Sequence, residues 1–384
     1  MALPLGERKR APLANVLPRE KRIAVLHALV NANSERSAAD LADVNARTVA
    51  RLAVEFGTGA ARVHDRIARE LTCTDIECDE TWNYVGKKQA RVTPEDAPEI
   101  GEAYTWTALD RASRFVISFH VGKRNQEHAN AFMADLRSRL VVMPSLSTDG
   151  LAAYVSAVGA EFGRSVDYGQ MSKNYRSGGR RDDDHRYEPP RGVEFITKKT
   201  VYGAPNMASI STAHNERQNA TMRHKIGRTR RLCYAFSKKY DHHVAAVALG
   251  YVWYNLGWIV KGLRMTPAMA VGATDHLWTI EEFHDAITAA AKEPEAKPEK
   301  RPLVHRTPEG TARELPNGRG FLRVVQGGGE APATPAGPPP VAPVAPVAGP
   351  EATALRFDEN GQGDLFSWRP AATKRGQLSL FDDA

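Results

Sequence analysis

The sequence has few cysteines and no apolar segment long enough to cross a membrane. Only three cysteines occur among 384 residues, which excludes a disulfide framework and leaves no second pair for a zinc site. Residues 1–17 carry charges but no apolar core of signal-peptide length, so we expect a flexible N-terminus and no export. The most apolar stretch, residues 244–260, contains Asn255 and is short of the roughly 20 residues that a span needs. We predict a reduced cytoplasmic protein with no membrane segment, and a buried core helix at 244–260.

Positive charge exceeds negative charge only slightly over the whole chain, but it is concentrated in one segment. There are 52 lysines and arginines against 45 acidic residues, a formal charge of +7. Residues 217–239 hold eight basic residues and no acidic one. A solvated face is the ordinary explanation of such a block, whereas phosphate contacts explain it better beside a candidate active site. The candidate DNA-contacting residues of this block are Arg217, Arg223, Lys225, Arg228, Arg230 and Arg231.

The N-terminal region, residues 18–71, is predicted to be all helical. Apolar periodicity and caps indicate short helices at 18–31, 37–44, 46–56 and 60–71, the third capped by Asn45 and ended by Gly57. The close spacing of the second and third helices is typical of a helix-turn-helix. Its second helix would direct Arg47, Thr48 and Arg51 toward a major groove. Any three-helix bundle would show the same spacing, so that alternative stays open.

From residue 73 the apolar period changes from helical to extended. Strands are predicted at 73–85, 103–110 and 114–121, followed by a helix at 125–140 and a strand at 141–147 that leads into Asp149. Three strands, a helix and a fourth strand that ends in an aspartate is the order of a ribonuclease-H-like domain. Because the first and fourth strands of that fold lie side by side, we expect Asp79 and Asp149 to share a metal ion.

Two further observations concern acidic residues. Asp79 interrupts a strand-forming run although aspartate is a poor strand former, which favours a metal ligand over an exposed edge-strand residue. Glu216 is predicted to lie in the first turn of a helix that begins at 213 and is capped by Ser211 or Thr212. The run of three aspartates at 182–184 falls in a glycine-rich, irregular loop predicted over 162–205, and we interpret it as solvated loop charge.

Beyond residue 290 the composition is that of a disordered tail. Residues 331–350 contain eight prolines and no apolar period. Near the end, the pentamers QLSLF at 377–381 and QGDLF at 362–366 resemble the short peptides that dock on the bacterial sliding clamp. Chance is the alternative for motifs this short. The candidate clamp-binding residues are Gln377, Leu378, Leu380, Phe381, Gln362, Leu365 and Phe366.

Three short motifs occur in order along the chain: CDETW at 78–82, STDG at 147–150 and HNERQN at 214–219. Together they resemble the transposases of the insertion sequence 1 family, and weaker similarity extends over residues 17–285. The resemblance implies a ribonuclease-H-like α/β catalytic domain at 72–290 with an insertion loop at 162–205. It would be preceded by a helix-turn-helix domain at 18–71 and followed by the tail at 291–384. Unlike many members, this chain has no cysteine-rich zinc ribbon before the helix-turn-helix.

The same resemblance implies the chemistry of a DDE transposase. Asp79, Asp149 and Glu216 would hold two Mg²⁺ ions, for which Mn²⁺ substitutes, and no covalent enzyme intermediate is needed. Arg217, Asn219 and Arg223 would position DNA phosphates. The expected partners are double-stranded DNA, as terminal inverted repeats and as target, and further copies of the chain in a bacterial nucleoid. An inactive DNA-binding regulator or domesticated transposase, and a nuclease of the same fold, stay open as alternatives.

Overall fold

The computed structural model describes residues 17–175, 193–230, 234–294, 300–304, 313–314 and 321–322. The chain divides into two units, 1–309 and 310–384. In the second unit, β7 (Arg313–Glu314) pairs antiparallel with β8 (Phe321–Leu322). Both clamp-like pentamers and Arg231 lie outside the described residues.

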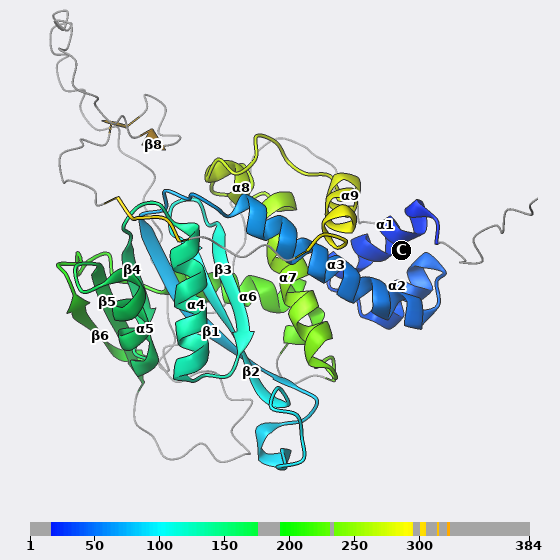
Figure 1. The fold of residues 1–384 in the computed structure, drawn as a ribbon, viewed down its shortest axis with the longest axis horizontal. Coiled ribbons are helices and arrows are strands. Elements are labelled where there is room, and N and C mark those ends of the chain that lie inside the picture. Colours follow the sequence, from blue (N-terminus) through cyan, green and yellow to red (C-terminus); the bar gives the residue numbers. More distant parts are fainter. Residues whose placement is uncertain are drawn as a thin grey trace, which may run out of the picture. The chain divides into compact units, whose positions relative to one another are not determined.

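A six-stranded mixed sheet is the centre of the first unit (Figure 1). Its order is β3-β2-β1-β4-β5-β6, in which β1 and β4, and β4 and β5, are parallel and the other neighbours antiparallel. The predicted adjacency of the first and fourth strands is confirmed, because Glu77 pairs with Ser147. The order confirms the ribonuclease-H-like α/β class. The strands are β1 (Asp75–Val85), β2 (Gly101–Asp110), β3 (Val116–Gly122), β4 (Ser145–Asp149), β5 (Asp167–Tyr175) and β6 (Val193–Tyr202).

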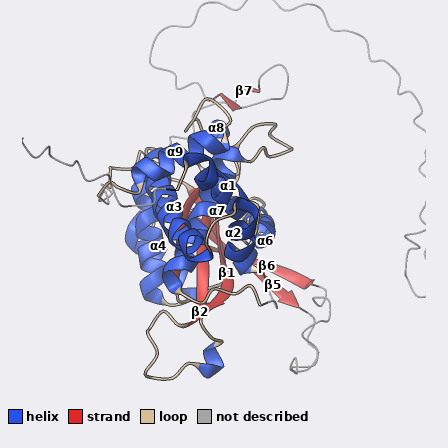
Figure 2. Ribbon diagram, turned by 90° about the vertical axis from the view of Figure 1, so that its right-hand side faces the viewer, coloured by secondary structure: helices blue, strands red, loops and turns tan. Residues whose placement is uncertain are grey.

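Helices cover both faces of this sheet (Figure 2). Because neighbouring strand residues point to opposite faces, two residues of β2 identify the layers. The buried Trp106 contacts Phe132 of α4 and Tyr154 of α5, whereas Thr107 bonds Asn215 of α6. The helices are α1 (Arg19–Val30), α2 (Glu35–Ala42), α3 (Ala46–Ile67), α4 (Gln126–Arg139), α5 (Ala152–Phe162), α6 (Ala213–Lys225), α7 (Tyr240–Gly257), α8 (Pro267–Ala270) and α9 (Ile280–Ala290), with short 3-10 turns η1 (Gln89–Arg91) and η3 (Gly227–Thr229).

Helix α3 is one continuous helix, so the prediction that Gly57 ends it is wrong. The predicted cap is confirmed: the Asn45 side chain accepts a hydrogen bond from the Arg47 amide at 2.9 Å. The glycines allow close packing instead. A Cβ at Gly57 would lie 2.4 Å from Ala245 of α7, and one at Gly59 would lie 1.9 Å from the Ile287 carbonyl oxygen of α9. Tertiary packing therefore outweighs the local tendency of glycine to end a helix.

The segment 162–205 is not simply an irregular loop, and that prediction needs correction. Strand β5 extends the sheet beside β4, where Asp149 pairs with Met171, and β6 pairs antiparallel with β5. Polar, glycine-rich composition hid these strands because ladder pairing with β4 supplies order that the local sequence does not. The three aspartates at 182–184 lie outside the described residues.

Helix α7 confirms the interpretation of residues 244–260 as a core helix. Leu249, Val252 and Leu256 are buried in the main core. Its polar residue Asn255 is also buried, and its side chain bonds both the amide and the carbonyl of Val116 at 3.0 and 2.9 Å. Within the described part of the chain, no helix combines the length and apolarity needed for a membrane span.

Candidate active site

Two adjacent acidic residues of β1 point to opposite faces of the sheet. Asp79 faces α6, where its Oδ2 accepts a hydrogen bond of 2.8 Å from Nδ2 of Asn219. Glu80 faces α5, where its Oε2 accepts a hydrogen bond of 3.0 Å from the hydroxyl of Tyr154. Both side chains are partly buried. The strand thus presents one carboxylate on each side of its backbone.

Asp149 brings a third carboxylate to the same place. It is the last residue of β4, two positions beyond the pairing of Ser147 with Glu77. The Leu151 amide bonds its Oδ1 at 3.0 Å, which orients the side chain at the strand end. Among the described residues, Asp79, Glu80 and Asp149 each offer an oxygen such that these three atoms lie within 4.8 Å of one another. We call these three residues the carboxylate cluster.

Glu216 approaches Asp79 from α6 but is outside that close group. It lies in the first turn of the helix, and Lys173 of β5 binds both of its carboxylate oxygens, Oε1 at 2.6 Å. Asn219, one turn later, is the residue that touches Asp79. Because residues three apart share a helix face, Glu216 and Asn219 both face the cluster. Glu216 adds, after burial, Glu80 and Asp149, to the effects that raise the pKa of the Asp79 carboxyl.

The cluster has an excess of negative charge. Burial, together with the charges of Glu80, Asp149 and Glu216, raises the pKa of Asp79 from 3.8 to about 8. Burial and Asp149 also raise the pKa of Glu80, against the opposing effect of Arg124. Arg124 binds Glu80 and Asp149 at 2.5 and 3.1 Å. When Glu216 and its partner Lys173 are included, two basic side chains meet four carboxylates, so the formal charge with every group ionised is +2 − 4 = −2.

These donors fit a divalent cation. Carboxylate oxygens are the hard ligands that Mg²⁺ and Mn²⁺ prefer, and Mg²⁺ is commonly bound by one or two carboxylates together with phosphate oxygens. A bound cation would remove the repulsion that raises the pKa of Asp79. Asp79, Asp149, Glu80 and Glu216 are the residues whose positions allow them to contribute ligands.

The candidate DNA-contacting residues lie in two places. On α3, Arg47 and Arg51 are exposed and Thr48 is half-buried. On α6, Arg217 is exposed, whereas the candidate Asn219 is buried against Asp79.

The remaining basic candidates follow in the second half of α6 and in η3. Arg223 is half-buried and Arg230 is exposed. Lys225 packs 4.1 Å from the centre of the Trp258 ring. Arg228 forms a 2.6 Å ion pair with Glu35 at the start of α2. At least one of these basic side chains therefore fastens the helical N-terminal region to the residues after α6.

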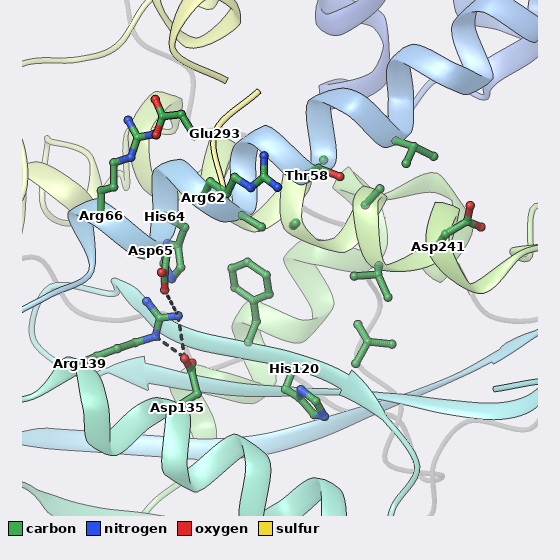
Figure 3. A pocket seen from close by; sticks show the side chains of 18 of the residues that line it. Thr58, Arg62, His64, Asp65, Arg66, His120, Asp135, Arg139, Asp241 and Glu293 are labelled. Atoms are coloured by element: carbon green, nitrogen blue, oxygen red, sulfur yellow. Dashed lines mark hydrogen bonds and ion pairs between the residues drawn. The ribbon is translucent and has the colours of Figure 1, made fainter. Parts of the chain in front are cut away.

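A cavity of about 850 Å³ lies elsewhere, between α3, β3, α4 and α7. Figure 3 shows two groups of paired charges in it, Arg139 between Asp65 and Asp135 and Arg66 beside Glu293, while Asp241 lies apart from them. None of the carboxylates around Asp79 lines it. Its lining is thus internally neutralised, unlike the cluster.

Sequence reasoning missed several residues around the cluster. Glu80 is next to Asp79, but strand alternation placed it on the other face and gave no sign that both would reach Asp149. Lys173 lay in the supposed loop, and Arg124 precedes α4 without a motif. Of the two expected caps of α6, the Ser211 hydroxyl accepts from the Ala213 amide at 3.1 Å, whereas the Thr212 side chain makes no cap bond and its hydroxyl donates to Glu216 at 3.0 Å.

Comparison with known proteins gives no close relative. Neither a family model nor a curated protein matches the sequence. Among solved structures, the chain is similar to a piggyBac transposase synaptic complex with hairpin DNA at a TM-score of 0.34 and 9% identity, covering 74% of each chain. It is also similar to the Mos1 strand transfer complex at a TM-score of 0.22 and 12% identity, covering 73% of this chain and 81% of that chain. A pre-cleavage Mos1 transpososome matches at 0.22 and 10% identity, covering 73% and 82%. An assignment of function therefore depends on the chemistry of the site.

Proposed function

We propose that the chain is a metal-dependent transposase of the DDE type, which cleaves the DNA ends of an insertion element and joins them to target DNA. The observation that carries the proposal is the convergence of acidic residues from β1 and β4 on one point of a ribonuclease-H-like sheet, with the charge of Glu216 on α6 acting on Asp79 from outside that group. There, Asp79 has a pKa of about 8 because of burial and its acidic neighbours. Such a group of carboxylates is suited to divalent cations and hence to phosphodiester chemistry.

In this proposal Asp79 and Asp149 hold Mg²⁺ ions, with Glu216 and Glu80 completing the acidic ligands. When bound, the ions supply an activated oxygen nucleophile and stabilise charge on the leaving oxygen. The chain's own residues set the geometry. Asn219 fixes the orientation of Asp79 through its 2.8 Å hydrogen bond, and Lys173 holds Glu216 beside the sheet. Arg217, exposed next to Glu216, is placed to meet a DNA phosphate.

The motifs of the insertion sequence 1 family support this proposal at the level of sequence. HNERQN at 214–219 contains Glu216 and Asn219, and the second of these contacts Asp79. CDETW at 78–82 contains Asp79 and Glu80, which belong to the carboxylate cluster. The motif residues therefore meet although more than 130 residues separate them in the sequence.

The test uses labelled DNA that carries the inverted repeats flanking the coding region, with Mg²⁺ and an unlabelled target. We expect joined products from the wild-type chain and none from Asp149→Asn. Cleavage without joining would indicate a nuclease, and binding without cleavage an inactive regulator, so either result would overturn the proposal. Glu127→Gln is the matched control, because it removes an exposed acidic residue in the first turn of α4.

The partners proposed are terminal-repeat and target DNA, further copies of the chain, and the bacterial sliding clamp. DNA recognition would use Arg47, Thr48 and Arg51, and the clamp would take the pentamer that contains Leu380 and Phe381. The clamp is tested by binding of the full chain against a variant that combines Leu380→Ala with Phe381→Ala. Equal affinity of the two proteins would eliminate this partner.

A further inference from the structure

The residues that flank helix α6 cap only its first amide: that of Ala213 donates to the Ser211 hydroxyl at 3.1 Å. The first amides of a helix have no partner within it, and a preceding side chain usually accepts from them. Here the Thr212 side chain makes no cap bond. The amides of His214 and Asn215, in the first turn, are instead bonded by a side chain from the sheet.

That side chain is Glu77 of β1. Its Oε2 accepts from the amides of His214 and Asn215 at 2.8 and 3.0 Å. Its Oε1 accepts from Nδ1 of His214 at 2.8 Å and from Nε of Arg111 at 3.1 Å. The carboxylate is only 1% exposed, yet four donors surround it. A negative charge at this position also interacts favourably with the positive end of the helix dipole.

Asn215 makes a second attachment at the same end of the helix. Its Nδ2 donates to the carbonyls of Glu77 and Thr107, both at 2.9 Å, and its Oδ1 accepts from the Thr107 hydroxyl at 2.8 Å. The side chain is fully buried. One residue therefore bonds the backbones of both β1 and β2, and the first turn of α6 is fastened to two strands.

The rest of the interface makes fewer such bonds. Thr81 and Thr105 lie opposite each other on the same sheet face, and Gln218 is buried on α6. The hydroxyls of the two threonines and Nε2 of Gln218 make no hydrogen bond within the described residues. Apart from the bonds of Asn219 to Asp79 and of Lys173 to Glu216, the first turn therefore makes the contacts that fasten the helix to the sheet.

We propose that Glu77 is the positioning residue that sets Glu216 relative to Asp79. Glu77 and Asp79 are two residues apart on one face of β1. Glu216 directly follows Asn215, the residue to which Glu77 and Thr107 are hydrogen-bonded. Asp79 and Glu216 are therefore connected through the backbone of β1, the Glu77 carboxylate and the first turn of α6. This inference rests on the proposed function, in which Asp79 and Glu216 bind metal ions together.

The test compares Glu77→Gln with Asp110→Asn in the full chain. Asp110 is the matched control because it is a buried carboxyl of the same sheet, 4% exposed, whose bonds go to the Ser113 turn and not to α6. Mn²⁺ binding is measured by electron paramagnetic resonance, and hydrogen exchange is measured at the amides of His214 and Asn215. Neither measurement depends on DNA cleavage.

For Glu77→Gln we expect faster exchange at both amides and a loss of Mn²⁺ affinity of about 10- to 100-fold, the scale seen when a residue that orients a ligand is changed. Asp110→Asn should keep the wild-type Mn²⁺ affinity even if it unfolds more easily. Unchanged affinity in Glu77→Gln, or an equal loss in Asp110→Asn, would overturn the inference. If Glu77→Gln does not fold, Thr107→Val, which removes one bond to Asn215, replaces it and should weaken Mn²⁺ binding to a smaller extent.

Failure of the proposed function would look different. A wild-type chain that binds Mn²⁺ but does not cut DNA would refute the transposase and leave the role of Glu77 to be judged from the binding data. A chain that cuts DNA normally after Glu77→Gln, over the whole range of Mg²⁺ concentrations, would refute the positioning role alone. At limiting Mg²⁺ we expect the Glu77→Gln chain to be slower, and at saturating Mg²⁺ to approach the wild-type rate.

Discussion

Asp79 and Asp135 are both partly buried, but their surroundings differ in the sign of the neighbouring charge. Burial opposes ionisation of Asp135, yet the charge and hydrogen bonds of Arg139 hold its pKa below the usual value. Arg139 binds the two oxygens of Asp135 at 2.8 and 2.9 Å. Asp79 faces three carboxylates and an amide, and its pKa rises to about 8.

The sign of the neighbouring charge distinguishes Asp135, which forms a structural ion pair with Arg139, from Asp79, a candidate cation ligand. Folding has supplied Asp135 with its own counter-ion, so removing that aspartate leaves a buried arginine with Asp65 as its acidic partner in place of two carboxylates. Among the described residues, the side-chain hydrogen bond that Asp79 accepts comes from the neutral amide of Asn219, and burial together with its acidic neighbours destabilises the carboxylate in the folded chain. Because the ionised form of Asp79 is unfavourable in the folded chain, this site is suited to bind a cation from solution. The Asp135 carboxylate already has Arg139 as its counter-ion and does not need one.

The largest expected effect is the loss of activity when the carboxylate cluster is changed. Asp79→Asn or Asp149→Asn should lower DNA cleavage by about 10³-fold or more, as expected for an essential group. The same changes should leave the free energy of unfolding in EDTA unchanged or increase it, because they remove repulsion. Cleavage assays measure the loss of activity, and urea unfolding measures the free energy of unfolding. A marked loss of stability would mean that Asp79, like Asp135, is stabilised by a partner within the folded chain.

Asp135→Asn should behave in the opposite way. Losing one of its two acidic partners should cost about 2 kcal/mol, because Arg139, 8% exposed, keeps its charge with only Asp65 beside it. Cleavage per folded molecule should stay at the wild-type level. Urea unfolding and single-turnover cleavage of the same preparation are the measurements, and an activity loss larger than the unfolded fraction explains would contradict the comparison.

The pH dependence of stability should have the sign set by Asp79. The folded chain binds this proton more tightly than the unfolded chain, whose pKa is 3.8, so the stabilising contribution is complete below that value. It is lost as the pH rises through about 8 in metal-free protein. We expect Asp79→Asn to abolish this loss, and Mg²⁺ to oppose it by binding the ionised form. Unfolding curves at pH 5 to 9 in EDTA and in Mg²⁺ provide the check; no difference between wild type and variant would be the contrary result.

The smallest effect is expected for Arg124, the basic residue that pairs with carboxylates of the cluster as Arg139 pairs with Asp135. It binds Glu80 and Asp149, but its side chain is 39% exposed, so solvent screens the interaction. Arg124→Gln should increase Mn²⁺ affinity by about two- to fivefold, since a competing cation is removed. Titration calorimetry measures the change. A loss of affinity would show that Arg124 orients the ligands and does not compete for them.

Much of the fold was predictable because short-range patterns specify it. Alternation in β1, the caps of the helices and the order of elements led to a ribonuclease-H-like sheet with Asp79 beside the strand of Asp149. The continuity of α3 through Gly57 and the pairing of β5 were not predictable, because each depends on a neighbour far away in the sequence.

The candidate site divides in the same way. Motifs located Asp79, Asp149 and Glu216; the first two belong to the carboxylate cluster, and the charge of Glu216 acts on Asp79 from outside it. Glu80 and Lys173 carry no local signal: one lies on the opposite strand face, and the other is in a segment whose composition indicated a loop. Both reach the site because β1 and β5 pair with β4 in the folded sheet, and local residue patterns do not specify that pairing.

The most direct test of the metal site is anomalous scattering from crystals grown with Mn²⁺. The Asp79 and Asp149 carboxylates should both contact a manganese peak, with Glu80 or Glu216 among the further ligands. If manganese binds elsewhere, or if Arg124 and Lys173 keep the carboxylates while no peak lies beside Asp79, the central claim is contradicted.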